Sequence, residues 1–327
     1  MFLRIFKSNM PIVIFLISLL ALGLWLKSFF DIPPREFTFD LVQMPLYKVL
    51  KNILGNNWIL RVISGLLFTL LLSFSLVRLN TKYFFINKRS YLPSLLFILI
   101  ASSLHALNRL NPVIIAAFFL VIALDRIIGT YRQDGLSYNY FEASFSISFG
   151  SLFYLNLAAF LPITWIGLIL FRPFKWREWL FTLIGFALPY IFLISYYYLV
   201  DKNLVHRVTN IYNNFKVTNG RYYLKDEYFL FLGYLGLLMI LASNHIIKNF
   251  PKKKIHARNS FILLLWVFII SLIAFFVLPS ASLELLIISS IPLSYLITNY
   301  FLFMKSKRWS EIFFFMLLAL VLLVQTI

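Results

Sequence analysis

Long runs of apolar residues, separated by short polar breaks, recur along the whole chain. The runs from Met10 to Leu26 and from Ser260 to Leu278 contain no charged residue. A helix needs about 20 mainly apolar residues to cross the hydrocarbon core of a bilayer. We therefore predict an all-α polytopic bundle that forms a single transmembrane domain over residues 1–327. The breaks predict about eleven crossings, at residues 10–27, 57–77, 91–107, 111–126, 142–156, 158–171, 180–200, 228–247, 260–278, 283–303 and 311–326.

Two of these segments, 142–156 and 158–171, are shorter than a standard crossing, and Pro162 lies near the start of the second. A re-entrant hairpin and a broken helix packed inside the bundle are both compatible with this pattern. We predict a full hairpin for the segments 142–156 and 158–171. Without it, the basic loop at 172–177 would fall on the side of the membrane opposite to the other basic loops.

Lysine and arginine predict the orientation, because loops rich in these residues stay in the cytoplasm. With a cytoplasmic N-terminus, 19 of the 30 basic residues fall on the cytoplasmic side, including the clusters at 252–254 and 305–308. We expect a protein of the bacterial inner membrane whose C-terminus lies outside. Asp125 and Arg126 are adjacent at a predicted cytoplasmic helix end and are expected to neutralise each other.

Two loops are long enough to carry a site, and both fall on the predicted outer side. In the first, residues 28–56, Pro33 and Pro34 favour an extended segment, and Asp40 is a predicted N-cap. The following stretch to Leu54 is apolar on one side and carries Lys48, Lys51 and Asn52 on the other. This pattern predicts an amphipathic helix lying in the membrane interface after the first crossing. The alternative is a flap that only covers the bundle.

The second outer loop, residues 201–227, mixes amides, aromatic rings and charges of both signs. Arg207, Arg221 and Lys225 are candidates for holding a lipid phosphate, because charged donors make strong hydrogen bonds to phosphate oxygens. Arg109, in a tight outer turn, could reach an anionic headgroup in the same way. An ordinary solvated loop would have a similar composition.

Composition excludes several classes of function. The chain is 61% hydrophobic and 13% charged, and it has no cysteine, so thiolate sites are excluded. The four histidines are scattered, and we predict neither a metal site nor a cofactor. The net charge of +18 is dispersed over short loops at helix ends. Anchoring to anionic lipid headgroups explains that distribution better than nucleic-acid binding does.

Several stretches together resemble a family of multi-pass inner-membrane proteins of Bacteroidota, mainly flavobacteria, with no established activity. The stretch at 90–94 leads into the turn at 107–112. The segment at 149–154 is followed by Arg-Pro-Phe-Lys-Trp-Arg-Glu-Trp at 172–179, the most specific piece. The resemblance extends over most of the chain. It implies a location in the cell envelope and no particular chemistry.

The order of elements is also similar to membrane glycosyltransferases that use polyprenyl-phosphate sugars. In that class an acid in the first outer loop acts as a base or helps to bind a metal. By position, this resemblance implies Asp31 as the catalytic acid, followed by Glu36 and Asp40. The sequence departs from the class in lacking an Asp-Asp or Asp-Glu doublet, and we expect no large C-terminal outer domain.

These observations leave two functional hypotheses. The first is a protein that handles lipid-linked glycans at the outer leaflet, either as a transferase or as a degenerate relative. Its partners would be membrane lipids, including a polyprenyl-phosphate-linked sugar. The second is a non-enzymatic membrane subunit that scaffolds an envelope or secretion complex through contacts with other membrane proteins. The sequence leaves open whether the protein is an enzyme.

Overall fold

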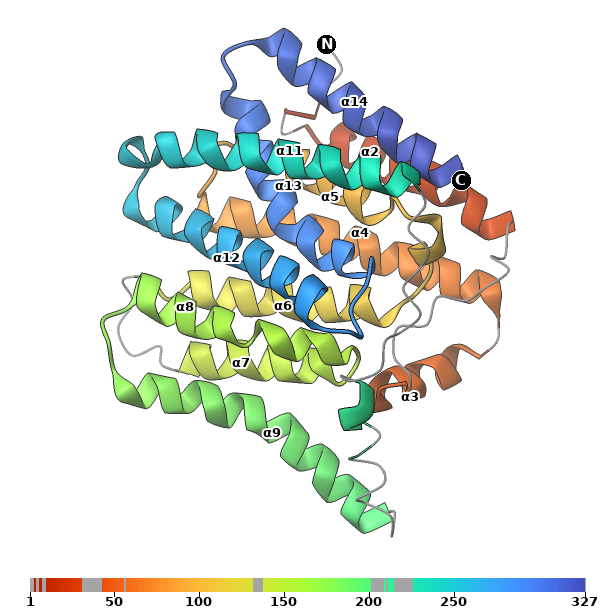
Figure 1. Ribbon diagram of the computed structural model, residues 1–327, viewed down its shortest axis with the longest axis vertical. Helices are drawn as coiled ribbons and strands as arrows, with labels where there is room; N and C mark the ends of the chain where they lie inside the picture. Colours follow the sequence, from red (N-terminus) through yellow and green to blue (C-terminus); the bar gives the residue numbers. More distant parts are fainter. Residues whose placement is uncertain are drawn as a thin grey trace.

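The computed structural model describes residues 3, 6–7, 10–30, 43–55, 57–131, 138–200, 209, 211–214 and 226–326. Helices packed side by side make up this part of the chain (Figure 1). The elements are α2 (Ile12–Phe30), α3 (Pro45–Leu54), α4 (Trp58–Tyr83), α5 (Leu92–Ala101), η1 (His105–Leu107), α6 (Pro112–Ile128), α7 (Tyr138–Ser151), η2 (Leu155–Phe160), α8 (Pro162–Phe171), α9 (Trp176–Val200), α11 (Asp226–Lys248), η3 (Phe250–Lys252), α12 (Ile255–Val277), α13 (Leu285–Phe303) and α14 (Lys307–Thr326).

Each predicted crossing coincides with a helix, but fewer of them than predicted have the length of a crossing. In the described part of the chain, seven helices are long and apolar enough to span a membrane: α2, α4, α9, α11, α12, α13 and α14. The prediction of a polytopic helical membrane protein is thereby confirmed. Helices α5, α6, α7 and α8 have only 10 to 17 residues. The number of about eleven crossings is not confirmed and stays a prediction.

One end of the bundle gathers the turn before α13, the turn after α7 and the turn before α6. The Tyr154 hydroxyl, just after α7, donates to Glu284 Oε1, just before α13, over 2.9 Å. The Leu110 amide, before α6, donates to the carbonyl of Arg61 in the first turn of α4 over 2.8 Å. We call this the Glu284 end. The sequence predicts that all these turns lie on the outer side.

The opposite end gathers the turns that the sequence predicts to be cytoplasmic. Lys253, just before α12, donates from Nζ to Oδ1 of Asn299 near the end of α13 over 2.9 Å. Lys82, in the last turn of α4, pairs with Asp125 in the last turn of α6 at 2.9 Å. We call this the Lys253 end. The helices therefore keep the alternating directions that the predicted topology requires.

The doubtful region at 142–171 forms two helices that run in opposite directions. The Tyr140 hydroxyl, near the start of α7, donates to the carbonyl of Gly167 in the second half of α8 over 3.3 Å. At the other end of α7, the Ser151 and Tyr190 hydroxyls lie 2.6 Å apart, so α9 runs parallel to α7. Helix η2 joins α7 to α8. A hairpin is present, and whether it crosses the membrane stays a prediction.

The predicted amphipathic helix after the first crossing is present as α3. It begins at Pro45 with Met44 as the N-cap residue, so the prediction of Asp40 as its N-cap is wrong. Proline at the first helical position favours this later start, because its fixed φ suits a helix and its missing N–H is not needed there. The Leu46 amide donates to the Leu152 carbonyl over 3.3 Å, which places α3 at the Glu284 end. Its orientation relative to a membrane stays a prediction.

The expectation that Asp125 and Arg126 neutralise each other is wrong. Asp125 pairs with Lys82 of α4, whereas Arg126 Nε lies 3.0 Å from Glu142 Oε2 of α7. Adjacent residues on a helix point in directions about 100° apart, so each finds a partner on a different neighbouring helix. These two pairs connect α6 to α4 and to α7 at the Lys253 end.

Candidate functional site

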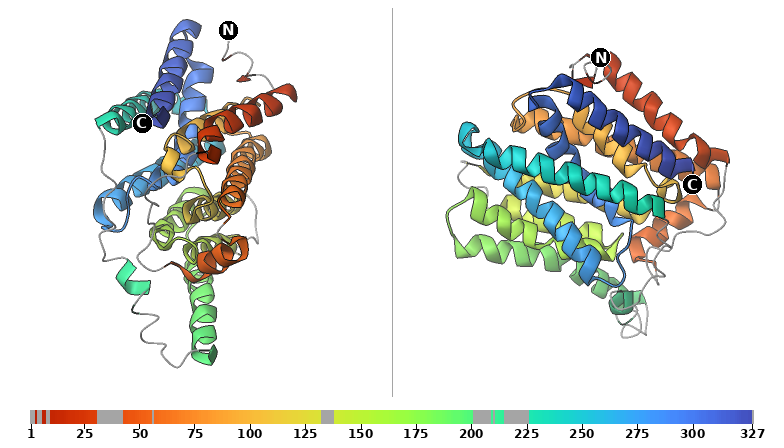
Figure 2. Two further views of the ribbon diagram at one scale, coloured as in Figure 1. Left: turned by 90° about the vertical axis from the view of Figure 1, so that its right-hand side faces the viewer. Right: turned by 45° about the horizontal axis from the view of Figure 1, so that its top comes forward.

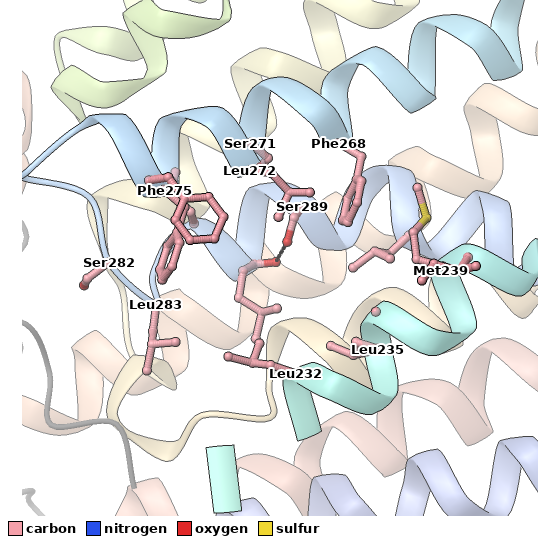
Figure 3. A pocket seen from close by; sticks show the side chains of 16 residues that line it. Leu232, Leu235, Met239, Phe268, Ser271, Leu272, Phe275, Ser282, Leu283 and Ser289 are labelled. Atoms are coloured by element: carbon pink, nitrogen blue, oxygen red, sulfur yellow. Dashed lines mark hydrogen bonds between the residues drawn. The ribbon is translucent and has the colours of Figure 1, made fainter. Parts of the chain in front are cut away.

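A cavity of about 400 Å³ lies between α11, α12 and α13 (Figure 3). All three helices are long and apolar enough to span a membrane. Leu232, Leu235 and Met239 of α11 face Phe268 and Phe275 of α12 across it. Its volume is within the range of about 300–1,000 Å³ that is usual for small-molecule sites.

Three hydroxyl groups interrupt the apolar lining. Ser289 of α13 donates to the carbonyl of Leu286 over 3.1 Å, and Ser282 donates to the Glu284 carboxylate. Ser271 of α12 is 3% exposed, and its hydroxyl has no hydrogen-bond partner among the described residues. A buried hydroxyl without a partner costs free energy.

At the Glu284 end, Ser282 connects the cavity to a buried carboxylate. Glu284 precedes the first residue of α13 and is 1% exposed. It accepts three hydrogen bonds: from the Ser282 amide over 2.9 Å, from the Ser282 hydroxyl, and from the Tyr154 hydroxyl over 2.9 Å. Donors from two distant parts of the chain therefore fix the orientation of this carboxylate.

The network continues through the segment between α7 and η2. Asn156 Nδ2 donates to the Tyr154 hydroxyl over 3.0 Å, and the Ser280 hydroxyl donates to Asn156 Oδ1 over 2.9 Å. The loop before α13 and the segment after α7 thus hold each other through side chains alone. Such a connected set of buried polar groups defines a single geometry, as long as all of its members are satisfied.

The comparisons place the chain in a family. The model of a family of unknown function, DUF6427, matches residues 37–327. The chain belongs to this family. No curated protein and no solved structure matches it significantly. The predicted membership in a family without established activity is confirmed. The resemblances to Bacteroidota proteins and to glycosyltransferases gain no support and stay predictions.

The cavity and the Glu284 network lie entirely within the part of the chain that matches DUF6427. Of the three acids predicted from the glycosyltransferase resemblance, only Asp40 falls in the matched range. The structure does not test the predicted site as a whole. The residues that lie outside the described part of the chain are Asp31, Glu36, Asp40, Arg207, Arg221 and Lys225.

Arg109 is the one predicted site residue of this DUF6427 chain that the structure describes. It lies in the turn between η1 and α6 and is 5% exposed. Its guanidinium carbon is 5.6 Å from the centre of the Trp58 ring, a cation–π arrangement. Its backbone packs on α4, since a Cβ at Gly65 would lie 2.5 Å from the Arg109 carbonyl carbon. Arg109 therefore helps to pack α4, and a role in phosphate binding stays a prediction.

Sequence reasoning did not find the Glu284 network. The predicted crossing at 283–303 includes Glu284 but indicates no partner for it. One usable signal was a lone acid beside Ser280 and Ser282 in an otherwise apolar stretch, because an ionisable group near membrane depth usually has a partner. The partner itself, Tyr154, is 130 residues away. No local pattern predicts that contact.

Proposed function

We propose that this protein binds a long-chain lipid in the membrane, with the hydrocarbon chain in the cavity between α11, α12 and α13. The polar head would then lie at the Glu284 end. The observation that carries the proposal is the cavity itself, which is mainly apolar and reaches Ser282, the hydrogen-bond partner of a buried carboxylate. A mainly apolar cavity between helices of membrane-spanning length suits a hydrocarbon chain.

The lysine and arginine distribution supports a finer version of this proposal. With all eleven helical segments crossing the inner membrane and the N-terminus in the cytoplasm, the Glu284 end faces the outer leaflet. The bound lipid would be a polyprenyl-phosphate carrier of a glycan. Glu284, already oriented by three donors, would accept a hydrogen bond from a hydroxyl of the glycan. Glycosyltransferase activity, with Asp31, Glu36 or Asp40 as the acid, is the most specific form of the proposal.

The test of the cavity uses two glycines of α11. Gly236 lines the cavity and Gly233 does not, and a Cβ added at either glycine meets nothing within 4 Å. Gly236→Leu therefore adds a side chain at a cavity-lining position whose Cβ is unobstructed, and Gly233→Leu is the matched control. Both substitutions raise helix propensity by a similar amount, up to about 1 kcal/mol.

The measurement is binding of undecaprenyl phosphate to the full chain in a mild detergent, followed by native mass spectrometry. We expect Gly236→Leu to weaken binding about tenfold or more, which corresponds to at least about 1.4 kcal/mol. Gly233→Leu should bind as the unchanged protein does. Equal binding by both variants would remove the lipid chain from this cavity. If the unchanged protein binds no lipid at all, the scaffold hypothesis is to be preferred.

A further inference from the structure

Two ammonium groups converge on one aromatic ring at the Lys253 end, far from the Glu284 network. Lys88, in the turn between α4 and α5, places Nζ 5.1 Å from the centre of the Phe303 ring. Lys253, before α12, places Nζ 5.5 Å from the same ring centre. Both cations therefore lie within 6 Å of one exposed ring at the last residue of α13.

In the described part of the chain, neither Lys88 nor Lys253 forms an ion pair with a carboxylate, although Glu311 of α14 lies near Lys7. Ion pairs described elsewhere include Lys82 with Asp125, Arg126 with Glu142, and Arg172 with Glu178. Contact with a ring stabilises a cation by about 0.5–2 kcal/mol but does not neutralise it. Lys88 and Lys253 therefore keep their positive charges beside the Phe303 ring.

The negative end of the α13 dipole favours these cations but does not neutralise them. A lysine near a helix C-terminus is favourable when it reaches the last carbonyl groups. Lys7 does so, because its Nζ donates to the Phe301 carbonyl over 2.8 Å. Lys253 instead donates to the side-chain Oδ1 of Asn299.

Hydrogen-bond donors are also in excess at this point. Asn299 is 1% exposed, and its Oδ1 already accepts from Lys253. Its Nδ2 has no acceptor among the described residues. An anion with several oxygens would offer acceptors to the ammonium groups and, after a small rotation of the Asn299 amide, to this nitrogen. Phosphate has this charge and these oxygens.

We propose that the Lys253 end holds a phosphate-binding site, with Lys88 and Lys253 on either side of the phosphate and Lys7 as a third, more distant cation. The phosphate would come from the headgroup of an anionic lipid or from a soluble molecule. Phe303 ends a membrane-length helix, so the site lies at the depth of lipid headgroups. This inference does not depend on the proposed lipid site at the Glu284 end.

The charge state of Lys253 suits this role. Burial lowers the pKa of Lys253 to about 8, so the ammonium form predominates at neutral pH. Burial also lowers the pKa of Lys7, and Lys88 and Lys307 add to this effect while Glu311 opposes it. Cations that are costly to keep charged gain most from a bound anion, since it offsets both burial and mutual repulsion.

The test measures binding to the full chain in a neutral detergent by calorimetry. One arm titrates inorganic phosphate, and two further arms titrate phosphatidylglycerol and phosphatidylcholine. We expect Lys88→Gln and Lys253→Gln each to weaken phosphatidylglycerol binding about tenfold, as expected for the loss of one charge-assisted contact. Lys252→Gln and Lys254→Gln are the matched controls, because these exposed neighbours carry the same charge and should change binding less than twofold.

The three titrations distinguish a lipid headgroup site from a general phosphate site and from diffuse attraction. Binding of phosphatidylglycerol alone identifies a lipid headgroup site, and competition by inorganic phosphate identifies a general phosphate site. Equal binding of phosphatidylcholine, or equal losses in the Lys252 and Lys253 variants, would overturn the proposal in favour of diffuse attraction. Lys88 is exposed, so Lys88→Gln keeps the test decisive even if Lys253→Gln fails to fold.

Discussion

Helices α13 and α9 have similar apolar sequences but opposite surroundings. Both are long and apolar enough to cross a membrane. In the apolar window of α13, 89% of residues are buried inside the protein, compared with 11% in α9. Figures 1 and 2 show α13 in the middle of the bundle, whereas α9 lies at one edge and its far half extends beyond the other helices. Hydrophobicity alone therefore does not separate an inner from an outer helix.

The difference lies in small hydroxyl residues. Helix α13 carries Ser289, Ser290, Ser294 and Thr298 among its apolar residues, and all of them are buried. The Ser290 and Ser294 hydroxyls donate to carbonyls of their own helix over 2.6 and 2.7 Å, so they need no partner elsewhere. Small residues let helix backbones approach closely, whereas lipid tails solvate large apolar residues as well as a protein interior does.

Helix α9 instead touches the protein along one narrow stripe. Its buried residues are Glu178, Thr182, Gly185 and Pro189. Their spacing of three and four residues places them on a single face. A Cβ at Gly185 would lie 2.5 Å from the Phe141 carbonyl oxygen, so α9 and α7 are in backbone contact there. Outside this stripe, large residues such as Phe192 and Leu199 are exposed.

The sharpest test of the comparison truncates one aromatic residue in each helix. Tyr295 of α13 is fully buried, and its hydroxyl donates to the Leu76 carbonyl over 2.6 Å, whereas Phe192 of α9 is 67% exposed. We expect Tyr295→Ala to lower the free energy of unfolding by roughly 3–5 kcal/mol, as for other buried aromatic residues. Phe192→Ala should change it by less than about 0.5 kcal/mol.

The measurement is unfolding of the purified protein in mixed micelles with increasing sodium dodecyl sulfate. Tyr295→Phe, which removes only the hydroxyl, serves as an intermediate and should cost about 1 kcal/mol. A large loss of stability in Phe192→Ala would show that a partner covers α9, and the comparison between an inner and a lipid-facing helix would then be wrong.

A smaller effect is expected where α9 meets α7. Gly185→Leu inserts a side chain into a backbone contact and should destabilise the protein by about 1–3 kcal/mol through overpacking. Ala187→Leu adds a side chain to an exposed position of the same helix and is the control. Limited proteolysis of the loop at 172–175 would report whether α9 has separated. Equal protection in both variants would mean that the contact at Gly185 tolerates a larger residue.

The contrast between α13 and α9 also explains how much of the structure could be predicted from the sequence. Local patterns were enough to place a helix at each predicted crossing and to predict α3, because apolar periodicity and polar breaks are properties of neighbouring residues. They did not predict the first residue of α3, because the helix begins at Pro45 and is not capped by Asp40. The number of crossings stays a prediction, since an apolar segment such as Leu92–Ala101 can either span lipid or be buried in protein.

The site was harder to predict than the fold, because its contacts are not local. The Glu284 network joins residues near 155 to residues near 282, and the lysines at the Lys253 end come from three separate turns. Charge and residue type led to the prediction of site residues in the long outer loops. These acids and basic residues lie outside the described part of the chain. Glu284 and Asn299 are both buried, one at each end of α13, and the structure brings a separate group of polar side chains to each of them. In the sequence, Glu284 and Asn299 look like ordinary positions at the ends of an apolar helix.

The last expected effect is a pH dependence at the polar end of α13. Lys253 donates to Asn299, and burial lowers its pKa to about 8 from an ordinary value of 10.5. Between these two values the unfolded chain binds a proton that the folded protein does not, so stability should rise with pH through this window. Below about pH 8 both states are charged, and the cost of burying the ammonium is fully present.

Thermal unfolding of the unchanged protein and of Lys253→Gln, in a buffer without phosphate, measures this effect. The melting temperature of the unchanged protein should rise relative to that of the variant as the pH rises from 8 to about 10, and the two curves should be parallel below pH 7. His245 lies near Lys253 and is present in both proteins. Lys252→Gln controls for the loss of one charge, and its curve should parallel that of the unchanged protein throughout. If the Lys253→Gln curve does so too, Lys253 is solvated, and the polar end of α13 is not buried as the comparison with α9 requires.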